Sequence, residues 1–362
     1  MLNNAIEILK EITSKGYQAY IVGGFVRDYL LNFESKDIDI STDASPRQIK
    51  ELFEDAIISN QEYGSVTLYR NSLRYEITTF RIEKNYINHR TPTQIEYIKD
   101  LISDLKRRDF TINTLCIDEN KNVIDKLNGK EDLNNKIIRC VGDAQEKISE
   151  DSLRILRAIR FATILDFKLD DELKKAIINN KESLKLLSYN RKKEELDKIF
   201  ASSNSNKGVQ LLIELGLDKE LEINNLNKVN INNPIGIWAI LDVCDIYPFT
   251  RLEKDQIENI QKVLKYDNKD PYILYKYGLY VNTICATIKS IDTHIINEIY
   301  ENMPIHSRKE INIEPIDIIR IFDKKPGKYI KDIYTKIEKN ILHNRLNNKK
   351  CDIIKYIENI KE

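Results

Sequence analysis

A chain of 362 residues is too long for one small hydrophobic core, so we expect it to form two to four compact units. Apolar residues make up 41% of the sequence and charged residues 31%, which are ordinary values for a soluble globular protein. No segment approaches the roughly 18 consecutive apolar residues of a membrane span. The N-terminal residues show helical periodicity instead of the apolar stretch of a targeting peptide. These features predict a cytoplasmic protein with no membrane partner.

The cysteines and histidines argue against two common kinds of site. The five cysteines are scattered, odd in number and never arranged as C-x-x-C, which indicates a reducing compartment without a disulfide framework or a zinc site. None of the four histidines is followed by an aspartate, so a histidine-based metallohydrolase domain has little to build on.

Charged residues are unevenly distributed although the formal net charge is zero. Residues 324–362 contain eleven Lys and Arg against five Asp and Glu, a local excess of six positive charges. Such a segment can hold the phosphates of a nucleic acid while the whole chain stays neutral. A solvated helix surface has the same composition, and composition alone favours that interpretation.

The N-terminal third alternates predicted helices and strands. The first segment carries apolar residues on one helical face and ends at Gly16, a typical helix stop. A short strand over residues 19–22, a Gly-Gly turn and a second helix follow. A second strand, residues 37–41, leads to Ser45 and Pro46, which combine a helix N-cap with a first-turn proline.

Further strand signals end well before the middle of the chain. Residues 65–69 and 74–80 have strand-like patterns and flank a turn at residues 70–72. Beyond about residue 140 the sequence has the spacing of helices joined by Asn-rich loops. We therefore predict the α+β class, with an N-terminal head built on a small mixed sheet and followed by all-α domains.

Two aspartates on the predicted strand 37–41 are the first candidates for chemistry. Side chains at i and i+2 of a strand share a face, so Asp37 and Asp39 project together while Ile38 and Ile40 pack into the core. Paired carboxylates repel each other unless a cation lies between them, and their hard oxygens suit Mg²⁺. Two such ions can bridge an attacking hydroxyl and a triphosphate. The pattern predicts Mg²⁺ as the cofactor of a nucleotidyl transfer.

A glycine pair, Gly23 and Gly24, precedes these aspartates and opens a helix. Glycine lets backbone N–H groups approach a phosphate, and a helix start favours negative charge. Arg27, one turn into that helix, is expected to hold the same triphosphate. A lone D-x-D is weak evidence, but a glycine turn, a helix and a D-x-D strand at this spacing form a much more specific signal.

Glu76 is a candidate third carboxylate. It lies in the strand-like segment 74–80 and would complete the metal site if that segment neighbours residues 37–41. An exposed strand glutamate is the alternative interpretation.

Several motifs, in order and at matching spacing, resemble the class II tRNA nucleotidyltransferases, the CCA-adding enzymes, whose close relatives include bacterial poly(A) polymerases. The resemblance runs from Ala19 to Phe200 and continues loosely beyond, through helical character. The motifs are IVGGFVRD at residues 21–28, DIDIS at 37–41, LKRRDFTIN at 105–113, DKLNGKEDL at 125–133 and EDSLRILRAIRF at 150–161.

The resemblance implies a seahorse-like arrangement of four domains. These are a catalytic head at residues 1–138, a base-recognising neck at 139–200, a helical body at 201–265 and a helical, tRNA-binding tail at 266–362. The motif at residues 125–133 is expected to be a hinge between head and neck.

The family's site residues carry over to matching positions of this sequence. Asp37 and Asp39, together with Glu76, would be the catalytic acids, with the two aspartates holding the metal. An Asn amide can hydrogen-bond a ribose hydroxyl. The residues expected to bind the triphosphate and sugar are Gly23, Gly24, Arg27, Arg107, Arg108, Asp109 and Asn113. Without the family, residues 107–109 read equally well as a charged helix start.

The motif at residues 150–161 would read the incoming base. On one helix, Asp151 and Arg154 are three residues apart and face the same way. A carboxylate accepts from the exocyclic amine of cytosine or adenine and a guanidinium donates to the ring nitrogen, whereas uracil and guanine present mismatches. Arg157 would support the base or Asp151, and Glu150 would orient Arg154. An intrahelical ion pair is the alternative.

Residues 81–92 resemble the family's flexible loop between the first two motifs. Relatives that add only CC have this loop shortened, whereas here it has full length, which favours complete CCA addition. His89 and Arg90 would act within the loop or be simply exposed to solvent.

The resemblance predicts an enzyme that adds C, C and A to the 3′ end of tRNA from CTP and ATP. Lysines of the final helices would grip the tRNA backbone, namely Lys324, Lys325, Lys328 and Lys331. A poly(A) polymerase and an enzyme adding only CC or only A are the related alternatives. A non-catalytic RNA-binding protein with the same fold is the alternative from another class.

Overall fold

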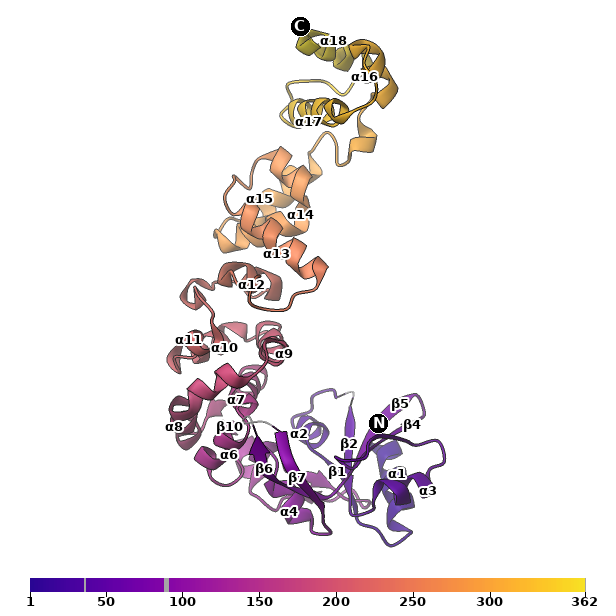
Figure 1. Cartoon of the computed structure of the whole chain (residues 1–362), viewed down its shortest axis with the longest axis vertical. Helices are drawn as coiled ribbons and strands as arrows, with labels where there is room; N and C mark the ends of the chain where they lie inside the picture. The colour runs from indigo at the N-terminus through magenta and orange to yellow at the C-terminus, as the bar shows by residue number, and fades with distance from the viewer. Residues whose placement is uncertain (36, 88–90, 362) are drawn as a thin grey trace. The chain divides into compact units, whose positions relative to one another are not determined.

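The computed structural model describes residues 1–35, 37–87 and 91–361, and these form an α+β protein (Figure 1). The chain divides into two compact units, Met1–Asn224 and Asn225–Glu362. The first unit contains the sheet and the helices that follow it, and the described elements of the second are helical. The predicted fold class is therefore confirmed, whereas the division into four domains stays a prediction.

A seven-stranded sheet forms the centre of the first unit. Its central strand, β2, pairs in parallel with β5 and antiparallel with β1. Ile38 and Ile40 of β2 are fully buried, so Asp39 points to the opposite face. The order is β3-β4-β5-β2-β1-β8-β9, with β1 Ala19–Val22, β2 Ile38–Thr42, β3 Ile57–Asn60, β4 Ser65–Arg70, β5 Leu73–Thr79, β8 Cys116–Ile117 and β9 Val123–Ile124.

The helices around this sheet begin at clear local signals. Gly23, before α2, has a φ of 74°, a backbone conformation that favours glycine. Before α3, the hydroxyl of Ser45 accepts a hydrogen bond from the backbone N–H of Gln48. The side-chain oxygen of Gln48 accepts from the backbone N–H of Ser45, which completes a capping box. These helices are α1 Leu2–Thr13, α2 Gly24–Leu30, α3 Pro46–Leu52 and α4 Leu101–Lys106.

The segment that resembles a flexible loop is a β-hairpin. Strand β6, Arg81–Ile87, pairs antiparallel with β7, Thr91–Tyr97, and the hairpin connects β5 to α4. Strand structure was not expected over these residues, and isoleucine and tyrosine at alternating positions favour such pairing; the flexibility of the segment stays a prediction. His89 and Arg90 lie outside the described residues.

Mostly helical structure follows the sheet, with two departures from expectation. Among the described residues beyond 140 there is one more strand, β11 at Lys168–Leu169, which pairs in parallel with β10 at Ile137–Ile138. The expected single helix through residues 150–161 is broken at Asp151, whose φ of −140° and ψ of 103° are extended. The elements are η1 Thr111–Asn113, α5 Gly129–Asn134, α6 Ala144–Glu150, α7 Leu153–Ile164, α8 Asp171–Asn180, η2 Lys181–Leu186, α9 Tyr189–Phe200, α10 Ser205–Glu214 and α11 Asp218–Leu221.

The second unit is built from helices, and the last five of them, α14 to α18, share one apolar cluster. Leu274, Ile337 and Ile353 are fully buried in this cluster and come from three different helices. No helix of the described chain is long and apolar enough to cross a membrane. The elements are η3 Leu226–Lys228, α12 Pro234–Leu241, α13 Arg251–Val263, α14 Pro271–Ile288, α15 Thr293–Glu301, η4 Arg308–Glu310, α16 Pro315–Phe322, α17 Lys328–Leu342 and α18 Lys350–Lys361.

Candidate active site

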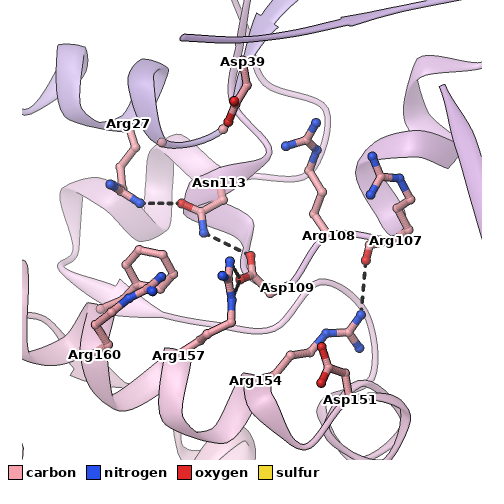
Figure 2. A pocket seen from close by; sticks show the side chains of 13 residues that line it. Arg27, Asp39, Arg107, Arg108, Asp109, Asn113, Asp151, Arg154, Arg157 and Arg160 are labelled. Carbon is pink, nitrogen blue, oxygen red and sulfur yellow. Dashed lines mark hydrogen bonds and ion pairs between the residues drawn. The ribbon is translucent and has the colours of Figure 1, made fainter. Parts of the chain in front are cut away.

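A strongly basic cavity of about 460 Å³ lies in the first unit, between the sheet and helix α7 (Figure 2). Six arginines and three aspartates line it, so its charge suits a polyanion such as a triphosphate. All ten residues predicted to bind the nucleotide line this cavity, as does Asp39. The lining residues are Gly23, Gly24, Arg27, Asp39, Arg107, Arg108, Asp109, Asn113, Asp151, Arg154, Arg157, Arg160 and Phe161.

The predicted metal site is at the β2 end of this cavity. Asp39 is in register with Glu76 of the parallel neighbour β5, so the condition for Glu76 to join the site is met. Asp37 lies one residue before β2 and is exposed. Partial burial raises the pKa of Asp39, although part of its side chain remains exposed. The Arg108 guanidinium opposes this rise, whereas the Glu76 and Asp37 carboxylates add to it.

The acidic side chains are suited to a divalent cation but are not gathered around one point. Within the described residues, no three His, Cys, Asp or Glu side chains are grouped as a metal site. The Glu76 carboxylate instead lies 3.5 Å from the Arg74 guanidinium. The donors are nevertheless hard oxygens, and the repulsion between them favours a cation in their midst. Asp37, Asp39 and Glu76 therefore fit Mg²⁺ by their chemistry.

Arg27 is fixed in place at the glycine turn. It is 7% exposed, its Nε lies 2.8 Å from Oδ1 of Asp28, and its Nη1 donates to Oδ1 of Asn113 at 2.8 Å. Its guanidinium lies 4.9 Å from the centre of the Phe161 ring. A guanidinium held from three sides is pre-organised for a phosphate.

Asp109 connects the head motifs to helix α7. Its Oδ1 accepts from the Asn113 amide at 3.0 Å, and its Oδ2 accepts from Nε of Arg157 at 2.7 Å (Figure 2). Burial alone would raise the pKa of Asp109, but Arg157 and Asn113 together hold it well below its usual range. A chain of contacts thus runs from Arg27 through Asn113 and Asp109 to Arg157, and the expectation that Arg157 supports the base or Asp151 stays a prediction.

The two consecutive arginines point to different sides of the cavity. Nη1 of Arg107 lies 3.3 Å from Glu83 of the hairpin, whereas Nη2 of Arg108 donates to the hydroxyl of Ser41 on β2 at 3.0 Å. Arg107 is the C-cap of α4, so this charge cluster ends a helix and does not start one.

Asp151 and Arg154 line the same cavity but do not share one helix. The Asp151 carboxylate accepts from the N–H of Leu153 at 3.0 Å, in the break before α7. Arg154 is 5% exposed, and its Nη1 donates to Glu150 at 2.8 Å, which agrees with an orienting role for Glu150. The alternative, an ion pair of Asp151 with Arg154 within one helix, is therefore wrong in its premise, and Arg154 of α7 pairs with Glu150 at the end of α6.

Two lining residues, Arg160 and Phe161, were absent from the predicted set. Arg160 pairs with buried Glu195 at 2.8 Å and lies 4.4 Å from the centre of the Phe161 ring. Arginine at every third position, 154, 157 and 160, was a usable signal, because such residues follow one side of a helix.

Comparisons with known proteins identify the family of this chain. The description "Poly A polymerase head domain" matches residues 19–139, "Probable RNA and SrmB- binding site of polymerase A" matches 166–223, and "tRNA nucleotidyltransferase domain 2 putative" matches 240–357. The CCA-adding enzyme of Staphylococcus haemolyticus is 34% identical over 395 residues, covering 100% of this chain and 99% of that protein. This chain belongs to the CCA-adding enzymes.

Solved structures of CCA-adding enzymes have the same fold. The Bacillus stearothermophilus enzyme in complex with CTP superposes with a TM-score of 0.85 at 25% identity, covering 98% of this chain and 96% of that one. The Thermotoga maritima CCA-adding enzyme complexed with tRNA gives a TM-score of 0.73 at 22% identity, with 99% and 95% covered. The second likeness concerns the fold alone.

Two other regions expected from this family have clear local structure. The Asp125 carboxylate accepts from the N–H groups of Leu127, Gly129 and Lys130, so it caps helix α5, and its role as a hinge stays a prediction. The four lysines proposed to bind tRNA are exposed. Two of them, Lys324 and Lys325, were expected on a helix but lie in the segment between α16 and α17.

Proposed function

We propose that this chain adds C, C and A to the 3′ end of tRNA from CTP and ATP, without a template and with release of pyrophosphate. The observation that carries the proposal is that Asp39 and Arg154 line one cavity. Acids suited to metal-assisted transfer and a side chain suited to reading a base therefore act on the same nucleotide. Membership of the CCA-adding enzymes supports the same activity.

Asp37 and Asp39 would hold Mg²⁺, with Glu76 as the third acid. When bound there, Mg²⁺ supplies charge that stabilises the attacking and leaving oxygens and favours deprotonation of the primer hydroxyl. The chain's own residues orient the nucleotide. Gly23 and Gly24 let the triphosphate approach the backbone, and Arg27, already fixed by its neighbours, binds its phosphates.

The base would be selected by Asp151 and Arg154. The carboxylate accepts from the exocyclic amine of cytosine or adenine, and the guanidinium donates to the adjacent unprotonated ring nitrogen. Uracil and guanine offer a carbonyl beside an N–H, which leaves both protein groups facing the wrong partner. Arg154 is suited to this because Glu150 and the carbonyl oxygen of Lys147 hold its Nη1 at 2.8 and 2.6 Å.

The second unit would provide the RNA contacts, with the exposed lysines 324, 325, 328 and 331 facing tRNA phosphates. A four-domain division at residues 138, 200 and 265 and a cytoplasmic location remain part of this proposal. The solved Thermotoga maritima relative was captured with tRNA, which supports this partner for the family.

A single assay tests the proposal and separates it from its rivals. A tRNA ending at the discriminator base is incubated with CTP, with ATP or with both, and products are resolved to single nucleotides while pyrophosphate is measured. CCA addition gives two added residues with CTP, three with both, and poor extension with ATP alone. Long ATP-dependent extension would identify a poly(A) polymerase, and arrest at CC with both nucleotides would identify a CC-adding enzyme. No product would mean either an A-adding enzyme, which needs a tRNA that already ends in CC, or a non-catalytic protein.

A further inference from the structure

A single buried carboxylate contacts both arginines of the motif at residues 105–113, namely Arg107 and Arg108. Asp104 in α4 is 0% exposed, and its Oδ1 accepts from Nε of Arg107 at 2.9 Å and from the backbone N–H of Arg81 at 3.1 Å. Its Oδ2 lies 3.5 Å from Nη2 of Arg108. Asp104 thus touches Arg107 and Arg108 at once, at the i+3 and i+4 positions of one helical face.

The contact between Asp104 and Arg108 is an ion pair without a hydrogen bond. Neither Oδ2 of Asp104 nor Nε of Arg108 has a hydrogen-bond partner in the described structure. Burial would raise the pKa of Asp104, yet Arg107 and Arg108 hold it below its usual value, so the group is ionised at neutral pH. A buried charge is costly unless it is paired, and here the pairing specifies where Arg108 lies.

Arg108 lies between this buried carboxylate and the predicted metal-binding acids. Nη1 of Arg108 and Oδ2 of Asp39 both lie close to Gly23. Their distances from the position that a Cβ atom on Gly23 would occupy are 3.3 Å and 3.6 Å, respectively. Figure 2 shows the Arg108 guanidinium turned toward Asp39. Within the described residues no ion pair joins these two side chains, because Arg108 is held by Asp104 and by the Ser41 hydroxyl at 3.0 Å.

We propose that Asp104 is a positioning residue that keeps Arg108 from neutralising the metal-binding carboxylates. With the Asp104 charge removed, Arg108 is free to turn toward the Asp39 carboxylate, where it competes with a divalent cation. With the charge present, Arg108 stays at the rim of the site and remains available to a phosphate. This inference rests on the metal role of Asp37 and Asp39 in the proposed function.

Binding of Mn²⁺ alone tests the inference, measured in the folded full-length protein by the electron paramagnetic resonance signal of the free ion. Asp104→Asn keeps the size of the side chain and removes its charge, and we expect its Kd for Mn²⁺ to rise about fivefold or more. In an Arg108→Gln background the competitor is absent, so adding Asp104→Asn should change the Kd by less than about twofold. This coupling distinguishes positioning from a purely structural role, which would not depend on Arg108.

Two controls assign each outcome. Asp100→Asn removes a carboxylate from the exposed N-cap of the same helix, and we expect it to leave the Kd unchanged. Asp39→Ala should abolish binding; if it does not, the metal assignment itself fails and the inference with it. An unchanged Kd in Asp104→Asn, or an equal rise with and without Arg108, overturns the inference alone. If the Asp104→Asn variant does not fold, the double variant Asp104→Asn/Arg108→Gln is compared with Arg108→Gln alone. A difference in the Kd for Mn²⁺ of more than about twofold between these two proteins contradicts the inference.

Discussion

Asp39 on β2 and Glu76 on β5 lie side by side, because the two strands are parallel and these residues are paired in register. Paired residues of neighbouring strands point to the same face of a sheet, so their carboxylates repel each other. Burial is the main cause of the raised pKa of Asp39, and the neighbouring Glu76 carboxylate adds to it. Two acids placed in this way on rigid strands have the donor chemistry that suits a divalent cation.

Removing these acids should stop nucleotide addition without releasing tRNA. We expect Asp39→Ala to lower kcat by about a thousandfold or more, since a catalytic metal contributes several kcal/mol and each 1.4 kcal/mol is tenfold. Glu76→Gln should lose about ten- to a hundredfold, as for a supporting group. Single-turnover addition of CMP to tRNA measures both, and a gel-shift assay follows binding.

The matched control is Glu51→Gln, which removes an exposed carboxylate from α3, away from the cavity. It should behave like the wild type. An Asp39→Ala protein that adds nucleotides at the normal rate contradicts the assignment of the metal site.

Base choice should depend on Arg154. We expect Arg154→Ala to lower the preference for CTP over UTP by about tenfold or more, since an unsatisfied buried partner costs about 1–3 kcal/mol. Competition between CTP and UTP on one tRNA gives the ratio of the two kcat/KM values. Arg47→Ala, at an exposed arginine of α3, serves as the control. An unchanged ratio in Arg154→Ala would show that the base is read elsewhere.

Tyr86 of the hairpin should contribute to the same choice. Its ring centre lies 5.9 Å from the Arg154 guanidinium, and its hydroxyl donates to Glu83 at 2.8 Å. A cation–π contact is worth about 0.5–2 kcal/mol, so Tyr86→Leu should reduce base selectivity severalfold. Tyr86→Phe keeps the ring and should retain more selectivity than Tyr86→Leu in the same competition assay. Equal losses in both variants would assign the effect to the hydroxyl.

The stabilising effect of Asp109 should depend on pH in a defined direction. Arg157 and Asn113 hold its pKa below the unfolded value of about 3.9, so its contribution is complete above that pH and declines as the pH falls further. Breaking a buried pair costs about 3–5 kcal/mol, and less here because the Arg157 side chain is 33% exposed. Asp109→Asn should therefore be less stable than the wild type by a constant amount from pH 7 to 5. Urea unfolding measures this difference, which should shrink only below about pH 4.

Periodicity predicted which side chains of β2 are buried but not the long-range contacts that line the cavity. The alternation of Asp37, Ile38, Asp39 and Ile40 fixed which side chains enter the core, and burial of both isoleucines confirms it. The pairing of Arg157 with Asp109 spans 48 residues and is set by how α7 packs, which no local pattern encodes.

The helix that was predicted to continue through Asp151 is interrupted there for a local reason, which the apolar periodicity does not reveal. Aspartate and serine compete for backbone N–H groups, and the Asp151 carboxylate binds the N–H of Leu153. That bond ends one helix and starts the next, although the apolar spacing continues through both. The Asp-Ser pair was therefore the sequence signal of the break.

The contribution of the exposed lysines to tRNA binding should be electrostatic. Lys328 and Lys331 lie in the first turn of α17, and each phosphate contact contributes about 0.7–0.9 to the slope of log K against log salt. Lys328→Ala/Lys331→Ala should weaken tRNA binding, reduce that slope by up to about 1.8, and leave kcat at saturating tRNA unchanged. The control Lys254→Ala/Lys262→Ala removes two lysines of α13 whose side chains are 43% and 53% exposed. Equal losses in the two double variants would mean that the basic C-terminal segment has no special role in holding RNA.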